Sequence, residues 1–408
     1  MIKVNMRERT ANDRFSIKNP LSCLLYLFSL STNSRRELNS NSHLSVIKIV
    51  VTGVLFCVLT VLSIYYRINK VYSDLTVSVR LTDLVQAIYD YFQFNVDLYF
   101  VYKYGRRYYQ EYYKQYTTID QVLGECSCSP IRAKINKLVF LFASFWVAVS
   151  AVDCFVWVST YGWMIPFAFS LTYIYLLLKI LTNLDFTYQT MHIEVRLGIM
   201  RNLILTQYLD CDSLSGATSD PVENKNWFYC NSSSFKRREF PKNSHSGIQW
   251  LSRCYLLLIE QSRFINQKFG FRMLLNSLSL LIDMVRFANL AIRIAVGSEY
   301  VVNYLAIVAA VSTIFRLILC AAILTNLVHH CEMVYRQNNK IICISDYMLN
   351  FKNPEPKLRE AITELKTLIQ SRPITFHMAN FIRLDYAMLM STASVVVTYT
   401  IILLQSLN

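Results

Sequence analysis

The chain has 408 residues, of which 54% are hydrophobic and only 17% are charged, and its formal net charge is +14. This composition excludes an ordinary soluble domain, whose surface needs more charged residues. A helix of about 20 apolar residues crosses a bilayer core about 30 Å thick, so runs of that length predict an all-α polytopic membrane protein. Seven runs qualify: 43–66, 81–102, 137–159, 164–183, 274–296, 299–328 and 384–405.

The first apolar stretch is shorter than a membrane span. Residues 20–30, PLSCLLYLFSL, follow several basic residues, as the apolar part of a signal peptide would. They lack a convincing small-residue cleavage site, and a full span begins soon after them. We therefore expect a short membrane-associated helix within a cytoplasmic N-terminal segment, residues 1–42.

The basic residues predict the orientation of the chain. With the N-terminus inside, the cytoplasmic segments hold 33 of the 41 lysines and arginines, and the outer loops hold 3. This asymmetry predicts a cytoplasmic N-terminus and, after seven transmembrane helices, an extracellular C-terminus. The positive charge then serves topology and contact with anionic membrane lipid, and it gives no reason to expect a nucleic-acid partner.

The long cytoplasmic connections are expected to form helical extensions. The tyrosine-rich segment YGRRYYQEYYKQY, residues 104–116, should continue the second span, and residues 187–209 should extend the fourth. Residues 210–247 are rich in Ser, Asn and Asp, which indicates a mobile loop. The predicted organisation is transmembrane helices 1–4 at 43–183, cytoplasmic helices with this loop at 184–273, transmembrane helices 5–6 at 274–328, cytoplasmic helices at 329–383 and a seventh transmembrane helix at 384–408.

A one-sided helix is predicted shortly before the last span. Leu358, Ile362, Leu365 and Ile369 recur at 4-3-4 spacing after two prolines. Such spacing places all four side chains on one face, so this helix should pack on a partner.

The last span carries a polar stripe. Ser391, Ser394, Thr398 and Gln405 fall within one narrow arc at 100° per residue, and Ile402 lies in the same arc. One explanation is helix–helix packing, in which the hydroxyl groups bond to a neighbouring helix. The other is a water-filled pore lined by several copies, with Ile402 as a constriction and Gln405 as a hydrated ring.

The chain's ending resembles a known family. TYTIILLQS contains Thr398, Tyr399 and Gln405 at the spacing of the C-terminal motif of insect gustatory receptors, and FHMANFIRLDYAML (376–389) is similar to that family's lead-in. The number of spans, the short outer loops and the length agree with the resemblance over essentially the whole chain. Two positions depart from the family pattern. Ser406 replaces the final Phe, which favours Ile402 and Gln405 as the gate, and Asn380 replaces a Gly whose bend Asn can preserve.

The resemblance implies a gustatory chemoreceptor. It would be a homo- or heterotetrameric, ligand-gated, non-selective cation channel in the cell membrane, in sensory neuron dendrites. Four copies of the last span would line the pore, a small-molecule tastant would bind in the outer half of each bundle, and residues 329–383 would anchor the subunits to one another.

Polar and ionisable residues inside the spans are the candidates for tastant binding, because such residues are costly in a bilayer. The fifth span also has Asp283 and Arg286 on the face that carries two of the candidates. The alternative is that Arg286 and Arg293 only neutralise Asp90, Asp153 or Asp283. Arg316 is expected to pair or to reach the membrane surface. The candidates are Gln86, Tyr89, Asp90, Asp153, Trp157, Tyr173, Asn289, Arg293, Asn303 and Tyr304.

Other functions have less support in the sequence. Consecutive residues such as His329, His330 and Cys331 point around a helix rather than at one ion, so no metal site is predicted, nor any cofactor or enzymatic activity. An odorant-type or co-receptor subunit of a heteromeric channel remains an alternative. A G-protein-coupled receptor would need the opposite orientation, and a transporter would show internal repeats and interrupted spans.

Overall fold

The computed structural model describes residues 20–30, 42–70, 72, 77–105, 107–123, 129–208, 245–296 and 304–405. They form an α-helical protein with one small hairpin, β1 (His377–Met378) and β2 (Ile382–Arg383). The expected loop at 210–247 lies almost entirely outside the described residues. The helices are α2 (Pro20–Leu27), α4 (Ser42–Lys70), α5 (Val77–Gly105), α6 (Arg107–Leu123), α7 (Ser129–Tyr161), α8 (Met164–Tyr208), α9 (His245–Val296), α10 (Tyr304–Phe351), α11 (Pro356–Ser371) and α12 (Tyr386–Gln405).

Each predicted span falls on one of α4, α5, α7, α8, α9, α10 and α12, so the all-α membrane fold is confirmed. Five of these helices are long and apolar enough to cross a bilayer by themselves: α4, α7, α8, α9 and α10. The apolar part of α12 is shorter, and α5 contains three aspartates. At 1.5 Å per residue, the 52 residues of α9 extend about 78 Å, so much of this helix must lie beyond a bilayer core.

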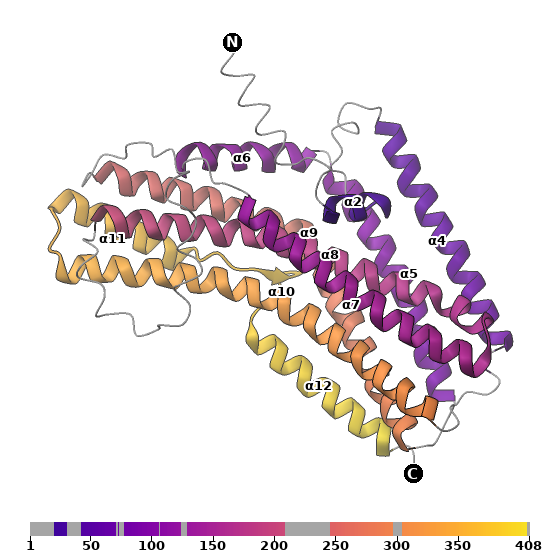
Figure 1. Ribbon diagram of the computed structural model, residues 1–408. Coiled ribbons are helices and arrows are strands. Elements are labelled where there is room, and N and C mark those ends of the chain that lie inside the picture. Colours follow the sequence, from indigo (N-terminus) through magenta and orange to yellow (C-terminus); the bar gives the residue numbers. More distant parts are fainter. Residues whose placement is uncertain are drawn as a thin grey trace.

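The helices form two packed regions (Figure 1). At one end, α6, α11 and the hairpin pack on the C-terminal halves of α8 and α10 and on the N-terminal half of α9. Leu258 and Leu327 are among the residues buried there. At the other end, α4, α5 and α7 pack on the remaining halves of the same three helices. The expected extension of the fourth span is present, because α8 continues without a break to Tyr208.

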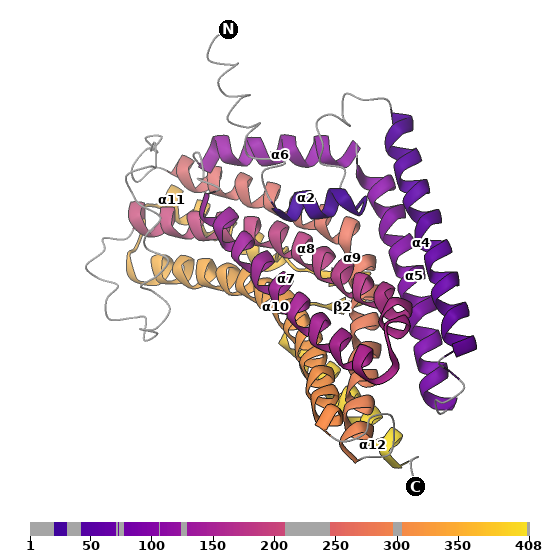
Figure 2. The ribbon, with the colours of Figure 1, turned by 45° about the vertical axis from the view of Figure 1, so that its right-hand side comes forward.

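The position of α4 explains its composition. Only 11% of its most apolar stretch is buried, compared with 67% for α8. Figure 2 shows α4 at the edge of the bundle, beside α5. The exposed valines and leucines of α4 therefore provide a surface that suits lipid.

The tyrosine-rich segment does not continue the second span, and this prediction was wrong. Helix α5 ends at Gly105, and α6 starts at Arg107 as a separate helix. Glycine is a poor helix former, which favours a break at this point. Tyr112, Tyr116 and Ile119 are buried on one face of α6, which packs against α9.

Two other local predictions are confirmed. Helix α11 buries Ile362, Leu365 and Ile369, as the 4-3-4 spacing indicated. Asn380, in the turn of the hairpin, has φ 63° and therefore keeps the left-handed bend that the family pattern assigns to glycine.

Candidate functional site

A polar seam joins α5 and α9 through the bundle. On each helix its members recur at spacings of three and four residues, which place them on one face. The partners run in opposite directions along the two helices, from Asp83 with Arg286 to Asp97 with Arg272. The seam consists of Asp83, Gln86, Asp90, Gln93 and Asp97 on α5, and of Arg272, Asn276, Ser279, Asp283 and Arg286 on α9.

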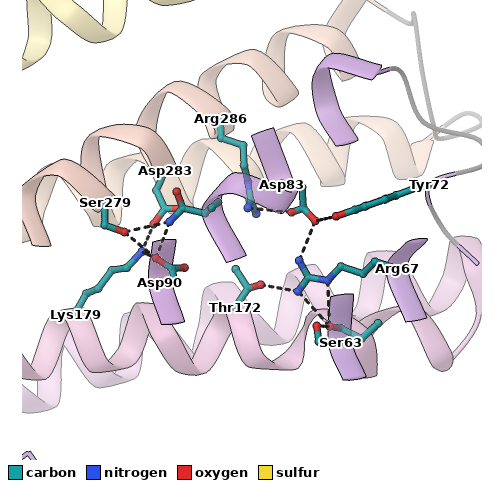
Figure 3. Close-up of polar contacts among 12 residues, drawn as sticks. Ser63, Arg67, Tyr72, Asp83, Asp90, Thr172, Lys179, Ser279, Asp283 and Arg286 are labelled. Atoms are coloured by element: carbon teal, nitrogen blue, oxygen red, sulfur yellow. Dashed lines mark hydrogen bonds and ion pairs between the residues drawn. The ribbon is translucent and has the colours of Figure 1, made fainter. Parts of the chain in front are cut away.

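The Asp83 cluster forms one end of the seam (Figure 3). Asp83 accepts hydrogen bonds from Arg67 at 2.8 Å, Arg286 at 3.1 Å and the Tyr72 hydroxyl at 2.7 Å. Arg67 also donates to the Thr172 hydroxyl at 2.9 Å. Burial and the neighbouring Asp83 carboxylate raise the pKa of Tyr72, so this hydroxyl remains a neutral donor. The sequence placed Arg67 just beyond the first span, but its side chain is buried in the bundle.

The Lys179 cluster occupies the middle of the seam. The Lys179 ammonium lies 2.8 Å from Asp90 Oδ1 and 2.6 Å from Asp283 Oδ2, so one cation on α8 links carboxylates on α5 and α9. Asp90 Oδ1 also accepts from Gln86 Nε2 at 2.7 Å and from the Ser279 hydroxyl at 2.8 Å. All three charged side chains are at most 3% exposed, which makes this a fully desolvated ion cluster.

The other end of the seam contains a further buried pair. Gln93 Nε2 donates to Asn276 Oδ1 at 2.9 Å, and Arg272 Nε lies 2.6 Å from Asp97 Oδ1. A small cavity next to these residues is lined by Asp90, Gln93, Phe94, Asp97, Tyr175, Leu178 and Lys179. It has room for about one water molecule. A drug-sized molecule needs about 300–1,000 Å³, so a molecule of that size could enter this cavity only if side chains moved.

A second cluster lies between α7, α8 and α10. Asp153 accepts hydrogen bonds from the Tyr173 hydroxyl, from Arg316 Nη2 at 2.6 Å and from the Ser312 hydroxyl at 3.3 Å. The Arg316 guanidinium lies 4.4 Å from the centre of the Tyr173 ring. Arg316, which was expected to pair or to reach the membrane surface, is therefore the charged partner of Asp153.

The structure brings the predicted ligand residues together in small groups. Gln86 and Asp90 share the Lys179 cluster, and Asp153 and Tyr173 share the second cluster. The Tyr89 hydroxyl donates to the Leu275 carbonyl at 3.1 Å.

The remaining predicted ligand residues lie elsewhere. Arg293 donates to Asn289 on the same helix at 3.1 Å. Trp157 is half-buried on α7. Asn303 lies outside the described residues, and the side chain of Tyr304 is not among those described.

Charged side chains do pair inside the bundle, as the alternative held, but the partners of Arg286 and of the three aspartates differ from those expected. Arg286 pairs with Asp83, which the sequence analysis did not select, and Asp90 and Asp283 pair with Lys179. The candidates chosen from the sequence did not include Lys179. A usable signal was present, since Asp83, Asp90 and Asp97 repeat every seven residues and must share one face of α5.

The polar stripe of α12 points away from its own bundle. Helix α12 packs on α9 and α10, and Thr400, roughly 180° from Ser391, is buried on that packed face. The stripe residues Ser391, Ser394, Thr398, Ile402 and Gln405 are all exposed in the single chain. The stripe residues therefore do not pack α12 against α9 and α10 of the same chain.

The hydroxyl groups on the two sides of α12 also differ in their partners. Thr392 and Thr400 donate to their own helix, to the carbonyls of Met388 at 2.9 Å and Val396 at 2.7 Å. Across the described ranges, the hydroxyls of Ser391, Ser394 and Thr398 have no hydrogen-bond partner. They are therefore available to groups outside the chain.

Five helices that are long and apolar enough to cross a bilayer, together with the shorter apolar helix α12, define a multi-pass membrane protein. The sequence matches the 7tm chemosensory receptor family over residues 19–406. The chain belongs to this family, as its ending indicated.

The solved structures to which the chain is similar are distant in sequence. The chain is similar to the insect olfactory receptor OR5 from Machilis hrabei in complex with eugenol, with a TM-score of 0.50, 9% identity and coverage of 91% of this chain and 92% of that chain. Another structure of OR5 from Machilis hrabei gives a TM-score of 0.48 and 12% identity, covering 87% of this chain and 89% of that one. No curated protein sequence matches the chain.

Proposed function

We propose that this chain is a gustatory receptor subunit that assembles with three others into a ligand-gated, non-selective cation channel. The observation that carries the proposal is the position of the α12 stripe, which is exposed on the side opposite the packed face. Four copies arranged around an axis would turn this stripe toward a shared lumen. Ile402 would then form an apolar constriction that gates by dewetting, and Gln405 would form a hydrated ring.

Water is a better partner for the stripe than lipid. Polar side chains facing hydrocarbon are costly unless they find hydrogen-bond partners. Ser391, Ser394 and Thr398 do not bond to their own helix, whereas Thr392 and Thr400 do. A wet lumen would satisfy all three hydroxyls at once.

The tastant is proposed to bind between the spans, near the two buried clusters. The candidates Gln86, Asp90, Asp153 and Tyr173 all take part in these clusters. Over the whole seam, four carboxylates (Asp83, Asp90, Asp97 and Asp283) are balanced by four cations (Arg67, Lys179, Arg272 and Arg286), and Asp153 is balanced by Arg316. The proposed ligand is therefore an uncharged molecule with hydrogen-bonding groups. Eugenol, which OR5 from Machilis hrabei holds, is a suitable first compound for a screen.

Expression in cultured cells with calcium imaging and patch recording tests the channel. After a compound panel has identified an agonist, Gln405→Leu and Ile402→Ala should alter ion selectivity, conductance or resting leak. Val397→Ala, at an exposed position outside the stripe, is the matched control. Wild-type currents in both stripe variants would contradict the pore assignment.

Two alternatives lead to different results in the same system. An odorant-type or co-receptor subunit would give currents only when a second receptor is expressed with it. A G-protein-coupled receptor would have its N-terminus outside, so a glycosylation tag placed before residue 20 would be modified. The proposed channel, with its N-terminus in the cytoplasm of a sensory neuron dendrite, leaves that tag unmodified.

A further inference from the structure

The segment between α11 and α12, residues 372–385, is held by side chains of α9 and α10. We refer to it as the strap. Asn266 on α9 binds the strap backbone twice, donating to the Thr375 carbonyl at 2.8 Å and accepting from the His377 amide at 3.1 Å. Tyr335 on α10 binds Phe376 in the same way, accepting from its amide at 3.0 Å and donating to its carbonyl at 3.3 Å. The strap thus bonds to two helices at neighbouring residues.

Gly270 allows the strap to approach α9 closely. A Cβ atom at this position would lie 2.9 Å from the His377 carbonyl oxygen and 3.2 Å from the Ala379 nitrogen. Both neighbours are backbone atoms, so they cannot move aside as the end of a flexible side chain can. Any larger residue at position 270 must therefore displace the hairpin.

The strap is also tied to the first turn of α12. The Leu384 amide donates to the Phe376 carbonyl at 3.0 Å, which closes the hairpin. At the start of α12, Asp385 accepts from the Met388 amide at 3.1 Å, and Glu332 of α10 accepts from the Tyr386 amide at 3.3 Å. A displacement of the backbone at His377 is therefore transmitted through these hydrogen bonds to the start of α12.

We infer that the strap sets the position of α12, and that Gly270 and Asn266 are the positioning residues that couple α12 to α9. Because the strap bonds to α9 and α10 at adjacent residues, a relative movement of these two helices would shift the base of α12. This inference rests on the proposed function only in taking α12 as the pore-lining helix. The coupling between the strap and α12 can be measured without a current.

Hydrogen–deuterium exchange of the purified full-length protein in lipid nanodiscs tests the coupling. Gly270→Ala is compared with Gly198→Ala, since a Cβ atom at Gly198 meets nothing within 4 Å and both changes improve helix propensity equally. Gly270→Ala should speed exchange in the first turn of α12 about tenfold, which corresponds to about 1.4 kcal/mol, and Gly198→Ala should not. Equal exchange in the two variants would overturn the inference.

A second pair of variants covers the case in which Gly270→Ala does not fold. Asn266→Ala removes two bonds to the strap without adding an atom, and Asn202→Ala, at an exposed position on α8, is its control. Faster exchange at the start of α12 in Asn266→Ala alone supports the inference, and its absence overturns it.

The proposed pore is tested separately in the same backgrounds. The rate at which a water-soluble methanethiosulfonate modifies a cysteine introduced as Thr398→Cys reports access to the lumen. A cysteine that never reacts would defeat the pore assignment and leave the exchange result standing. Reaction at rates that differ between Gly270→Ala and Gly198→Ala would show that the strap also influences the open and closed states.

Discussion

Lys179→Met should strongly destabilise the protein. Methionine keeps much of the length of the side chain but removes the ammonium that links Asp90 and Asp283. Two buried carboxylates from α5 and α9 would then face each other without a cation. Each carboxylate must then either take up a proton or draw water into the bundle.

The magnitude follows from the geometry and the burial. At 2.8 and 2.6 Å, each contact is worth about 6 kcal/mol of Coulomb attraction for an effective dielectric constant of about 20. The desolvation of the ions offsets much of this attraction, and the measured cost of removing one partner from a buried pair is about 3–5 kcal/mol. For a chain of this size that loss lowers the apparent Tm by roughly 3–6 °C.

The assay is thermal unfolding of the solubilised receptor followed by size-exclusion chromatography. Lys366→Met is the matched control, because Lys366 contacts Asp346 at 2.5 Å but the two side chains are 27% and 41% exposed. Loss of such an exposed pair costs about 0–1 kcal/mol. Adding Asp90→Asn and Asp283→Asn to Lys179→Met should restore most of the stability. A Tm for Lys179→Met equal to that of Lys366→Met would refute the reasoning.

Three further outcomes are expected in the same assay. Asp153→Asn and Arg316→Met should each lower the free energy of unfolding by about 2–4 kcal/mol, because each change alone leaves the other charge buried. The double variant should lose clearly less than the sum of the two. Additive losses would argue against the pair. Tyr72→Phe should cost about 1 kcal/mol, because Asp83 keeps both arginines; a loss as large as that of Lys179→Met would contradict this. Ala379→Gly should stabilise by about 0.5–1 kcal/mol, because Ala379 has φ 49°, and destabilisation would show that the methyl group is needed.

Much of the fold could be predicted because helix formation follows from local pattern. Apolar runs placed the seven spans, and the 4-3-4 spacing placed α11 and its buried face. Asn380 tolerates a left-handed backbone, so even the bend of the hairpin could be anticipated. The break between α5 and α6 was missed, although Gly105, at the end of α5, is a poor helix former.

The partners within the candidate site could not be predicted. Spacing along one helix shows which side chains share a face, but Asp90, Lys179 and Asp283 come from three helices whose relative rotation depends on packing. The stripe on α12 could be found because all its members lie on one helix. That the stripe is exposed could be established only from the structure, in which the opposite face of α12, with Thr400, packs on α9 and α10.

The most direct test of the pore compares two threonines of α12 that lie on opposite sides of the helix. Cysteines introduced as Thr398→Cys and Thr400→Cys are exposed to a cationic, water-soluble thiol reagent while an agonist holds the channel open. The account predicts that Thr398→Cys reacts and that the current is then blocked, whereas Thr400→Cys, on the packed face, stays unmodified. An unreactive Thr398→Cys, or equal reaction at both positions, would contradict a pore lined by this stripe.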